Sequence, residues 1–440
     1  MHETPTEGGP RHDNLRAESN PLDTVTSQSE LRRVFFLVSA GLFITSLGQP
    51  SVVGQLPFLF LFKNEFHLNA AQQANFFAVA TFAWYLKPVA GLLCDSFPIF
   101  GTKRRGYLVL AGTVGGLTWL LFAVVPHSYA NFFWLMVCLN CAMVIASTTI
   151  GGVLVMAGQK SHATGRLASI RYGIDGIISI IAGPLGGWLA TRAFGFTAGI
   201  GALLLFSLAP ITLAFLKEER GASRNLEVWS AAAVQFRLIF RSKTMWAAVA
   251  LLFLVFMAPG FGIALTYYQQ DVLRFSTVFI GRLQALSGVG SILATALYAY
   301  VCRRYSLRPL LLAGILLNAL SSILYLWYRS PETAMLIDTS NGFFAVLGIL
   351  PLFDLAARAT PKGSESFGYA LLMSVYNVAV HAISNPIGSW LYERPEATWH
   401  HHLRNLVLLN GGTSLIALAL VPFLPNILLS HRDGERATSA

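Results

Sequence analysis

Long apolar runs are the feature that most constrains what this chain can fold into. Twelve of them, each long enough to cross a bilayer as a helix, follow one another along the sequence. They lie at 34–62, 71–93, 107–126, 131–157, 166–191, 195–216, 245–268, 278–301, 308–328, 340–357, 367–391 and 405–429. Only 12% of the residues are charged and 54% are hydrophobic, which excludes a soluble enzyme and a disordered chain. We therefore expect an all-α membrane protein with twelve transmembrane helices, surrounded by the lipid bilayer.

The apolar runs fall into two groups of six, separated by a charged stretch. This division predicts a disordered cytoplasmic tail at 1–32, a six-helix half at 33–217, a cytoplasmic linker at 218–242, a second six-helix half at 243–430 and a short cytoplasmic tail at 431–440.

The distribution of Lys and Arg predicts the orientation in the membrane. With the N-terminus in the cytoplasm, the inner tails and loops carry 22 of these residues and the outer loops carry six. Both termini are therefore expected in the cytoplasm, and the formal net charge of +10 reflects topology rather than a face that binds nucleic acid. The sequence has no N-x-Ser/Thr acceptor, which favours a bacterial inner membrane.

A repeated nonapeptide relates the two groups of helices. PLGGWLATR at 184–192 returns as PIGSWLYER at 386–394, an offset of 202 residues, and the same offset places Pro57 onto Pro259. A parallel duplication of a six-helix unit is the architecture of the major facilitator fold, whose binding site lies between the halves near the midplane. We expect two pseudo-symmetric six-helix halves that work by alternating access.

The segment between the second and third runs has the features of a cytoplasmic gate. Gly91 permits a neighbouring helix to approach, and Asp95 at the membrane edge can meet the positive end of another helix. Arg104 and Arg105 follow a tight turn and also anchor the topology. These four residues are the predicted gate.

This segment resembles the folate and biopterin transporter family, a branch of the major facilitator superfamily. The matching residues are Trp84, Lys87, Pro88, Gly91, Asp95, Ser96, Pro98, Gly101, Arg104, Arg105 and Tyr107, and a later segment is similar at Phe275, Ser276, Gly281, Arg282 and Tyr298. The resemblance implies a folate-like or pterin-like substrate. In one respect the sequence departs from the family, because Ser147 and Gly151 stand where members usually carry two acidic residues four positions apart.

Ionisable and amide side chains within the apolar runs of the first half are candidate substrate ligands, since charge is costly inside a bilayer. Lys87, Arg171 and Asp175 are expected at similar depth. The two cations could attract an anionic substrate group, or Asp175 could neutralise one of them in a structural network. Gln49 and Gln55 lie beside prolines, where they either line the cavity or satisfy a kink.

The second half has a polar stripe with a titratable member. Asn377 is the counterpart of Asp175 at the 202-residue offset and is a further substrate candidate. His381, four residues on, could carry a coupling proton, as could Asp175, although a neutral packing histidine explains the residue equally well. Asp354 and Arg358 are expected to form a structural pair one helical turn apart.

No catalytic or cofactor-binding signature is present, so we expect neither an enzyme nor a cofactor. His400, His401 and His402 are adjacent, a spacing that rarely converges on one ion, and no metal site is predicted. The expected function is secondary active transport of a small organic solute by a single chain. Two alternatives remain: transport of another organic anion, amphipathic metabolite or drug, and a receptor or scaffold that uses a transporter fold without transporting.

Overall fold

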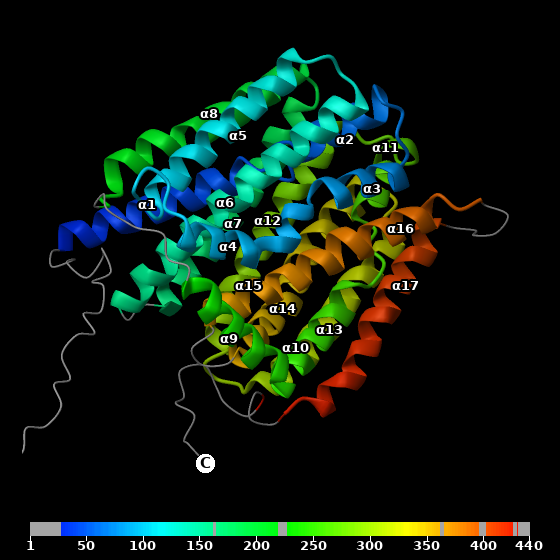
Figure 1. Ribbon diagram of the computed structural model, residues 1–440. Helices are drawn as coiled ribbons and strands as arrows, with labels where there is room; N and C mark the ends of the chain where they lie inside the picture. Colours follow the sequence, from blue (N-terminus) through cyan, green and yellow to red (C-terminus); the bar gives the residue numbers. More distant parts are fainter. Residues whose placement is uncertain are drawn as a thin grey trace, which may run out of the picture.

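The structure is a computed structural model and describes residues 28–161, 164–218, 227–360, 365–395, 402–425 and 429. Within these ranges every element is helical, apart from an isolated bridge between Ile99 and Thr102. Figure 1 shows most of the helices lying side by side in one bundle. Eight described helices are long and apolar enough to cross a membrane, or up to ten if each bent pair forms one span. The structure is therefore that of a multi-pass membrane protein, in agreement with the predicted fold class.

The elements of the first half are α1 (Gln28–Leu47), α2 (Gln55–Asn64), α3 (Ala70–Ala80), η1 (Phe82–Leu86), α4 (Lys87–Ser96), α5 (Arg105–Val124), α6 (Tyr129–Ser161), α7 (Thr164–Leu189) and α8 (Phe194–Phe215). After α9 (Glu227–Arg241), the second half contains α10 (Lys243–Phe256), α11 (Gly262–Asp271), α12 (Thr277–Val301), α13 (Leu307–Ile323), η2 (Leu324–Trp327), α14 (Pro331–Ala359), α15 (Glu365–Asn377), η3 (Val378–Ser384), α16 (Asn385–Tyr392), α17 (His402–Ile416) and η4 (Ala417–Phe423).

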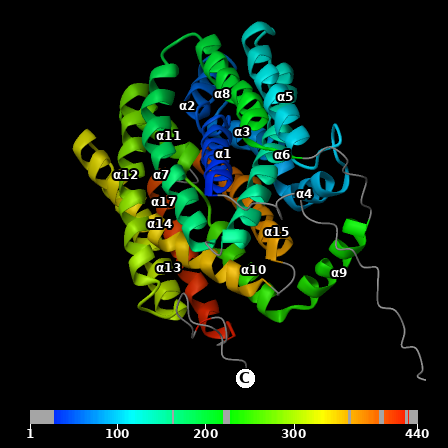
Figure 2. The same ribbon diagram turned by 90° about the vertical axis from the view of Figure 1, so that its left-hand side faces the viewer.

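Two elements differ from the sequence expectation. The segment expected as a linker contains α9, which is bent by 76° from α10 and lies apart from the long helices in Figure 2. Helix α14 begins at Pro331, nine residues before the apolar run that predicted it. A capping box formed by Ser330 and Thr333, with proline in the first turn, starts α14 upstream of its apolar part. This extension brings Asp338 into the helix.

Each half has its own hydrophobic core. In the first half the buried Phe58 ring packs against Trp119, Phe122, Phe132 and Phe194, with ring centroids 4.9 to 6.2 Å apart. In the second half a separate buried cluster joins α10, α13, α14 and η4. The two cores make each half a packed body.

The first helix of each half is interrupted, and side chains take up the freed carbonyls. Residues 48–54 separate α1 from α2, and the buried Trp119 Nε1 donates to the Gly48 carbonyl at 3.1 Å. Between α10 and α11, Ser384 Oγ donates to the Ala258 carbonyl at 2.5 Å, and Asn410 Nδ2 donates to the Pro259 carbonyl at 2.9 Å. Such breaks are tolerated at membrane depth where protein groups satisfy the backbone.

The repeated nonapeptides adopt the same local contact. The Arg192 guanidinium lies over the Trp188 ring at 5.2 Å from its centroid, and the Arg394 guanidinium lies over the Trp390 ring at 3.6 Å. The two copies of the nonapeptide repeat therefore share an Arg–Trp contact in the structure.

The halves meet along two seams. On one seam α7 packs against α12, where Gly183 and Gly187 of α7 face Gly281 of α12 with backbone against backbone. On the other seam α3 packs against α16, and α4 packs against α15. The space between these seams holds the cavity described next.

Candidate functional site

A cavity of about 650 Å³ lies between the two halves, a size typical of sites that enclose a small molecule. Both halves contribute polar side chains to its wall. Those of the first half are Thr45, Ser46, Gln49, Ser51, Gln55, Trp84, Lys87, Ser147, Asp175 and Ser179, and those of the second half are Thr266, Gln269, Gln284, Ser287, Ser291, Tyr325, Asp338 and Asn341.

Four of the residues predicted from the sequence as substrate ligands line this cavity together: Gln49, Gln55, Lys87 and Asp175. The break between α1 and α2 exposes both glutamines to the cavity, and Gln49 Nε2 also donates to the Thr45 carbonyl at 3.2 Å. Gln49 therefore lines the cavity and also satisfies a backbone carbonyl at the kink, which are the two roles considered for it from the sequence.

Lys87 lies at the start of α4, directly after the bent segment η1. Its Nζ donates to Ser147 Oγ at 3.3 Å and lies 5.4 Å from the centroid of the Trp84 ring. Trp84 is in turn fixed by a hydrogen bond from its Nε1 to Asn140 Oδ1 at 2.9 Å. Ser147 is one of the two positions singled out in the sequence as departures from the resemblance, and its hydroxyl is the group that meets the Lys87 ammonium.

The other two predicted substrate ligands, Arg171 and Asn377, and the predicted proton carrier His381 behave differently. Arg171 lies on α7, but its side chain is outside the described part of the structure. Asn377 is not in the cavity wall; its Nδ2 donates to the Trp84 carbonyl at 3.4 Å and so links the halves. His381 is also absent from the wall and lies in the π-helical segment η3, a type of distortion frequent at functional sites.

The acid in the second-half wall was missed by the sequence analysis. Asp338 of α14 is only 7% exposed, and its two oxygens accept hydrogen bonds from Tyr325 at 2.6 Å and Tyr328 at 2.7 Å. Gln269 Nε2 donates to the Tyr328 hydroxyl at 2.5 Å, which joins α11 to this group. The available signal was the capping sequence at Ser330, which would have placed Asp338 inside a helix.

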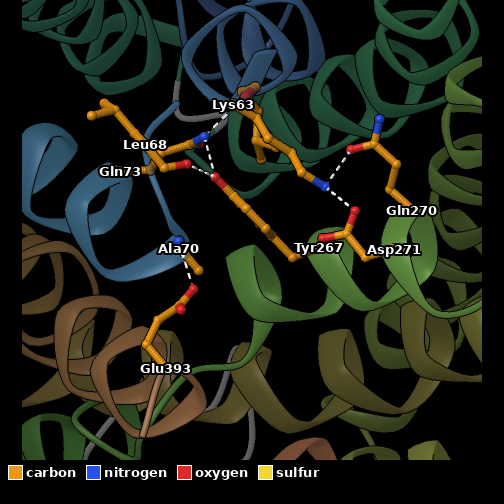
Figure 3. Close-up of polar contacts among 9 residues, drawn as sticks. Lys63, Leu68, Ala70, Gln73, Tyr267, Gln270, Asp271 and Glu393 are labelled. Atoms are coloured by element: carbon orange, nitrogen blue, oxygen red, sulfur yellow. Dashed lines mark hydrogen bonds and ion pairs between the residues drawn. The ribbon is translucent and has the colours of Figure 1, made fainter. Parts of the chain in front are cut away.

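At one end of the bundle an ion pair joins the two halves (Figure 3). Lys63 Nζ, at the end of α2, lies 2.5 Å from Asp271 Oδ1 and donates to Gln270 Oε1 at 2.7 Å, both at the end of α11. Lys63 Nζ also lies 4.5 Å from the centroid of the Tyr267 ring. In Figure 1 this end, with α2, α3, α11 and α16, is opposite the end with α9.

Three further hydrogen bonds join the halves beside this ion pair. The Tyr267 hydroxyl donates to the Leu68 carbonyl at 2.5 Å and accepts from Gln73 Nε2 at 2.5 Å. Glu393 Oε1 accepts from the backbone N–H of Ala70 at 2.9 Å, at the start of α3. We call Lys63, Gln73, Tyr267, Asp271 and Glu393 the Lys63 cluster.

The predicted gate segment lies at the opposite end, within the first half. Gly91 faces Thr148 of α6, and the Arg104 guanidinium lies beside Gly152. Asp95 is on α4, with its side chain outside the described part, and Arg105 begins α5. The carboxylate at the start of α5 is that of Glu218, which accepts from the backbone N–H groups of residues 103, 104 and 105 at 2.9 to 3.1 Å.

Asp354 and Arg358 form the expected pair, with Nη2 2.9 Å from Oδ2. His400 and His401 of the histidine triplet are outside the described residues. Among the residues that are described, no group of three His, Cys, Asp or Glu side chains could hold a metal ion.

Two packed helical halves around a shared polar cavity define a membrane transporter of the major facilitator fold. The crystal structure of a D-xylose–proton symporter, 17% identical in sequence, superposes with a TM-score of 0.66 over 90% of this chain and 98% of that chain. The chain belongs to the BT1 family, whose model matches residues 52–439. The resemblance read from the gate segment is thereby confirmed.

Curated relatives share similarity over most of their length. A folate-biopterin transporter of Synechocystis sp. is 28% identical over 397 residues, which cover 84% of this chain and 78% of that protein. Folate transporter 2 of Plasmodium falciparum is 24% identical over 405 residues, or 85% of each chain. These are transporters, as is this chain, and not enzymes.

Proposed function

We propose that this protein carries a folate-like or pterin-like solute through the cavity between its halves by alternating access. The observation that carries the proposal is the cavity itself, which has Lys87 in its wall, while the Lys63 cluster joins the two halves at one end of the bundle. The substrate class comes from the relatives, which are named for folate and biopterin.

Lys87 is the proposed partner of an anionic group of the solute, such as a glutamate carboxylate. An ammonium in a partly desolvated wall strengthens a charge-assisted hydrogen bond, and the adjacent Trp84 indole offers a flat apolar surface to an aromatic ring. Arg171 on α7 is proposed as a second cation, with Asp175 setting the local charge balance. Transport of a different organic anion would use the same residues.

The charge distribution of the loops supports an orientation with both termini in the cytoplasm. In that orientation the Lys63 cluster faces outward, and the gate segment with Gly91, Asp95, Arg104 and Arg105 faces the cytoplasm. We propose a plasma membrane, that of a bacterial cell, and a single chain as the working unit. The Lys63 cluster is then the external gate in its closed form.

Proton coupling is proposed for His381, with Asp175 as the second candidate. If His381 carries the proton, its replacement by Gln removes the dependence of uptake on external pH. Uptake by His381→Gln that follows the wild-type pH profile would assign the coupling elsewhere, and the same measurement on Asp175→Asn would then decide for or against that residue.

The deciding experiment measures the melting temperature of the purified full-length protein with folates, pterins and unrelated organic anions. A ligand that binds only the folded state raises this temperature by mass action, because it adds about 2.7 kcal/mol to the free energy of unfolding at one hundred times the Kd. Stabilisation by folates and pterins that is lost in Lys87→Gln and kept in the exposed control Lys243→Gln supports the proposal.

Two results would redirect it. Stabilisation by another anion alone would keep the transporter and discard the substrate class. Ligand binding without accumulation in proteoliposomes under any imposed gradient would favour a receptor built on this fold.

A further inference from the structure

We propose that Asp338 is the recognition residue for the aminopyrimidinone edge of the pterin ring, and that it sets the direction in which a folate lies in the cavity. This inference rests on the proposed function and assigns Asp338 as the group that binds the pterin ring of the solute. It comes from the way the second-half wall presents one buried carboxylate to the cavity.

The carboxylate of Asp338 is held in a fixed position. Tyr325 donates to one oxygen and Tyr328 to the other, and the two phenol rings are stacked with centroids 5.2 Å apart. Gln269 holds the Tyr328 hydroxyl from α11. Three elements, η2, α11 and α14, therefore fix the plane in which Asp338 can accept further hydrogen bonds.

The hydrogen bonds from the tyrosines use only part of the accepting capacity of Asp338. An ionised carboxylate has about four acceptor sites, and the tyrosines fill two. Asp338 lines the cavity and only 7% of it is exposed, so a donor arriving from the cavity meets it in a poorly hydrated wall. A charge-assisted hydrogen bond gains most in such a place.

The aminopyrimidinone edge of a pterin fits this acceptor by its chemistry. Its ring N–H and its exocyclic amine point the same way, as the two N–H groups of a guanidinium do, and such a pair meets both oxygens of a carboxylate. Asn341, one turn further along α14, also lines the wall, and its amide can donate to the adjacent ring carbonyl. The Tyr325 ring lies in the same wall beside the place for the pterin.

The position of Asp338 relative to Lys87 then gives the solute a direction. Asp338 belongs to the second-half wall and Lys87 to the first-half wall of one cavity. A folate has a donor edge at its pterin end and carboxylates at its glutamate end. Placing each end against the side chain of opposite character orients the molecule across the boundary between the halves.

The test compares dissociation constants for the purified full-length protein with two ligands. One is folic acid, and the other is its analogue in which hydrogen replaces the exocyclic amine. Loss of one hydrogen bond to a charged partner weakens binding roughly 10- to 100-fold, so the wild type should prefer folic acid by that factor. In Asp338→Asn the preference should fall to about one, because an amide cannot accept both donors.

The controls separate this role from a structural one. Asp354→Asn makes the same chemical change on the same helix, outside the cavity wall, and should leave the preference of the wild type intact. Tyr328→Phe keeps the carboxylate and removes one of its fixed donors, so it should reduce the preference only partly. It also supplies a second variant if Asp338→Asn does not fold.

Several outcomes overturn the inference. If the wild type binds folic acid no better than the analogue, the role of Asp338 is refuted and the proposed function still stands. An Asp338→Asn protein that weakens both ligands by the same factor assigns Asp338 a structural or proton-carrying role instead. A wild type that binds neither folates nor pterins refutes the proposed function itself.

Discussion

Lys63 Nζ and Asp271 Oδ1 lie 2.5 Å apart although 208 positions separate the two residues in the chain. Lys63 lies in the last turn of α2 in the first half, and Asp271 ends α11 in the second. The lysine side chain is 15% exposed and the aspartate side chain 51%, so water screens the pair in part. A contact of this kind can hold a gate closed without making it permanent.

Replacing Lys63 by Gln should shift the protein towards the state that is open at this end. A partly exposed ion pair contributes about 0.2 to 1 kcal/mol, which corresponds to a roughly 1.4- to 5-fold change in the open population. The measurement is the rate at which a membrane-impermeant thiol reagent labels Gln55→Cys, in a cysteine-free background, from the side where Lys63 lies.

The exchanged pair Lys63→Asp with Asp271→Lys tests whether charge is the cause. It should return the labelling rate towards that of the parent. A rate that stays high in the exchanged pair would assign the closure to Tyr267 and Gln73 instead of the ion pair.

Gly388→Ala should strongly destabilise the second half. A Cβ at this position would overlap the Gly260 carbonyl, at the break between α10 and α11 where the backbone cannot shift freely. Overpacking of this kind costs about 1 to 3 kcal/mol or more, and we expect a lower melting temperature and less folded protein. Gly412→Ala is the matched control, since no neighbouring atom lies within 4 Å of the position of its Cβ.

Trp119→Phe should lower stability by leaving the Gly48 carbonyl without its donor. An unsatisfied buried acceptor costs about 1 to 3 kcal/mol, and the smaller ring adds a cavity term. Thermal unfolding of Trp119→Phe beside Trp134→Phe checks this, because Trp134 is 67% exposed and should tolerate the change. Equal melting temperatures for the two variants would contradict the role given to Trp119.

Glu218→Gln should loosen the turn that precedes α5. The carboxylate accepts three backbone N–H groups there, and a neutral amide with one accepting oxygen cannot replace it. The expected loss is about 0.5 to 2 kcal/mol, by analogy with helix caps. Hydrogen exchange of the amides of residues 103–105 reports the change directly, and Lys217→Gln, on the exposed neighbour, should leave their protection unaltered.

The sequence was sufficient for features that depend on local composition and repetition. Runs of apolar residues predicted the membrane helices, and the nonapeptide repeat predicted two related halves. Polar or charged side chains within apolar surroundings singled out Gln49, Gln55, Lys87 and Asp175 as candidate ligands, and these four line the cavity in the structure.

Features that depend on long-range pairing could not be obtained in this way. The polar residues at 329–333 and 338–341 lower the hydropathy around Asp338, so the expected helix began after it. Its partners Tyr325 and Tyr328 precede that helix, and Gln269, which donates to Tyr328, comes from α11. Lys63 was counted only as a loop cation, because nothing in its neighbourhood indicates Asp271. The break at residues 48–54 contains Pro50, so a kink there was visible in the sequence, but its donor Trp119 comes from α5 and nothing near Gly48 indicates it.

The glycine seam between α7 and α12 limits how the halves can move. Gly183 and Gly281 bring two backbones together with no side chain between them, so the helices cannot approach further at that point. A larger residue on either side would act as a wedge. Any movement of the halves that would press α7 and α12 closer together at this point is therefore blocked, and the seam sets a lower limit on their separation.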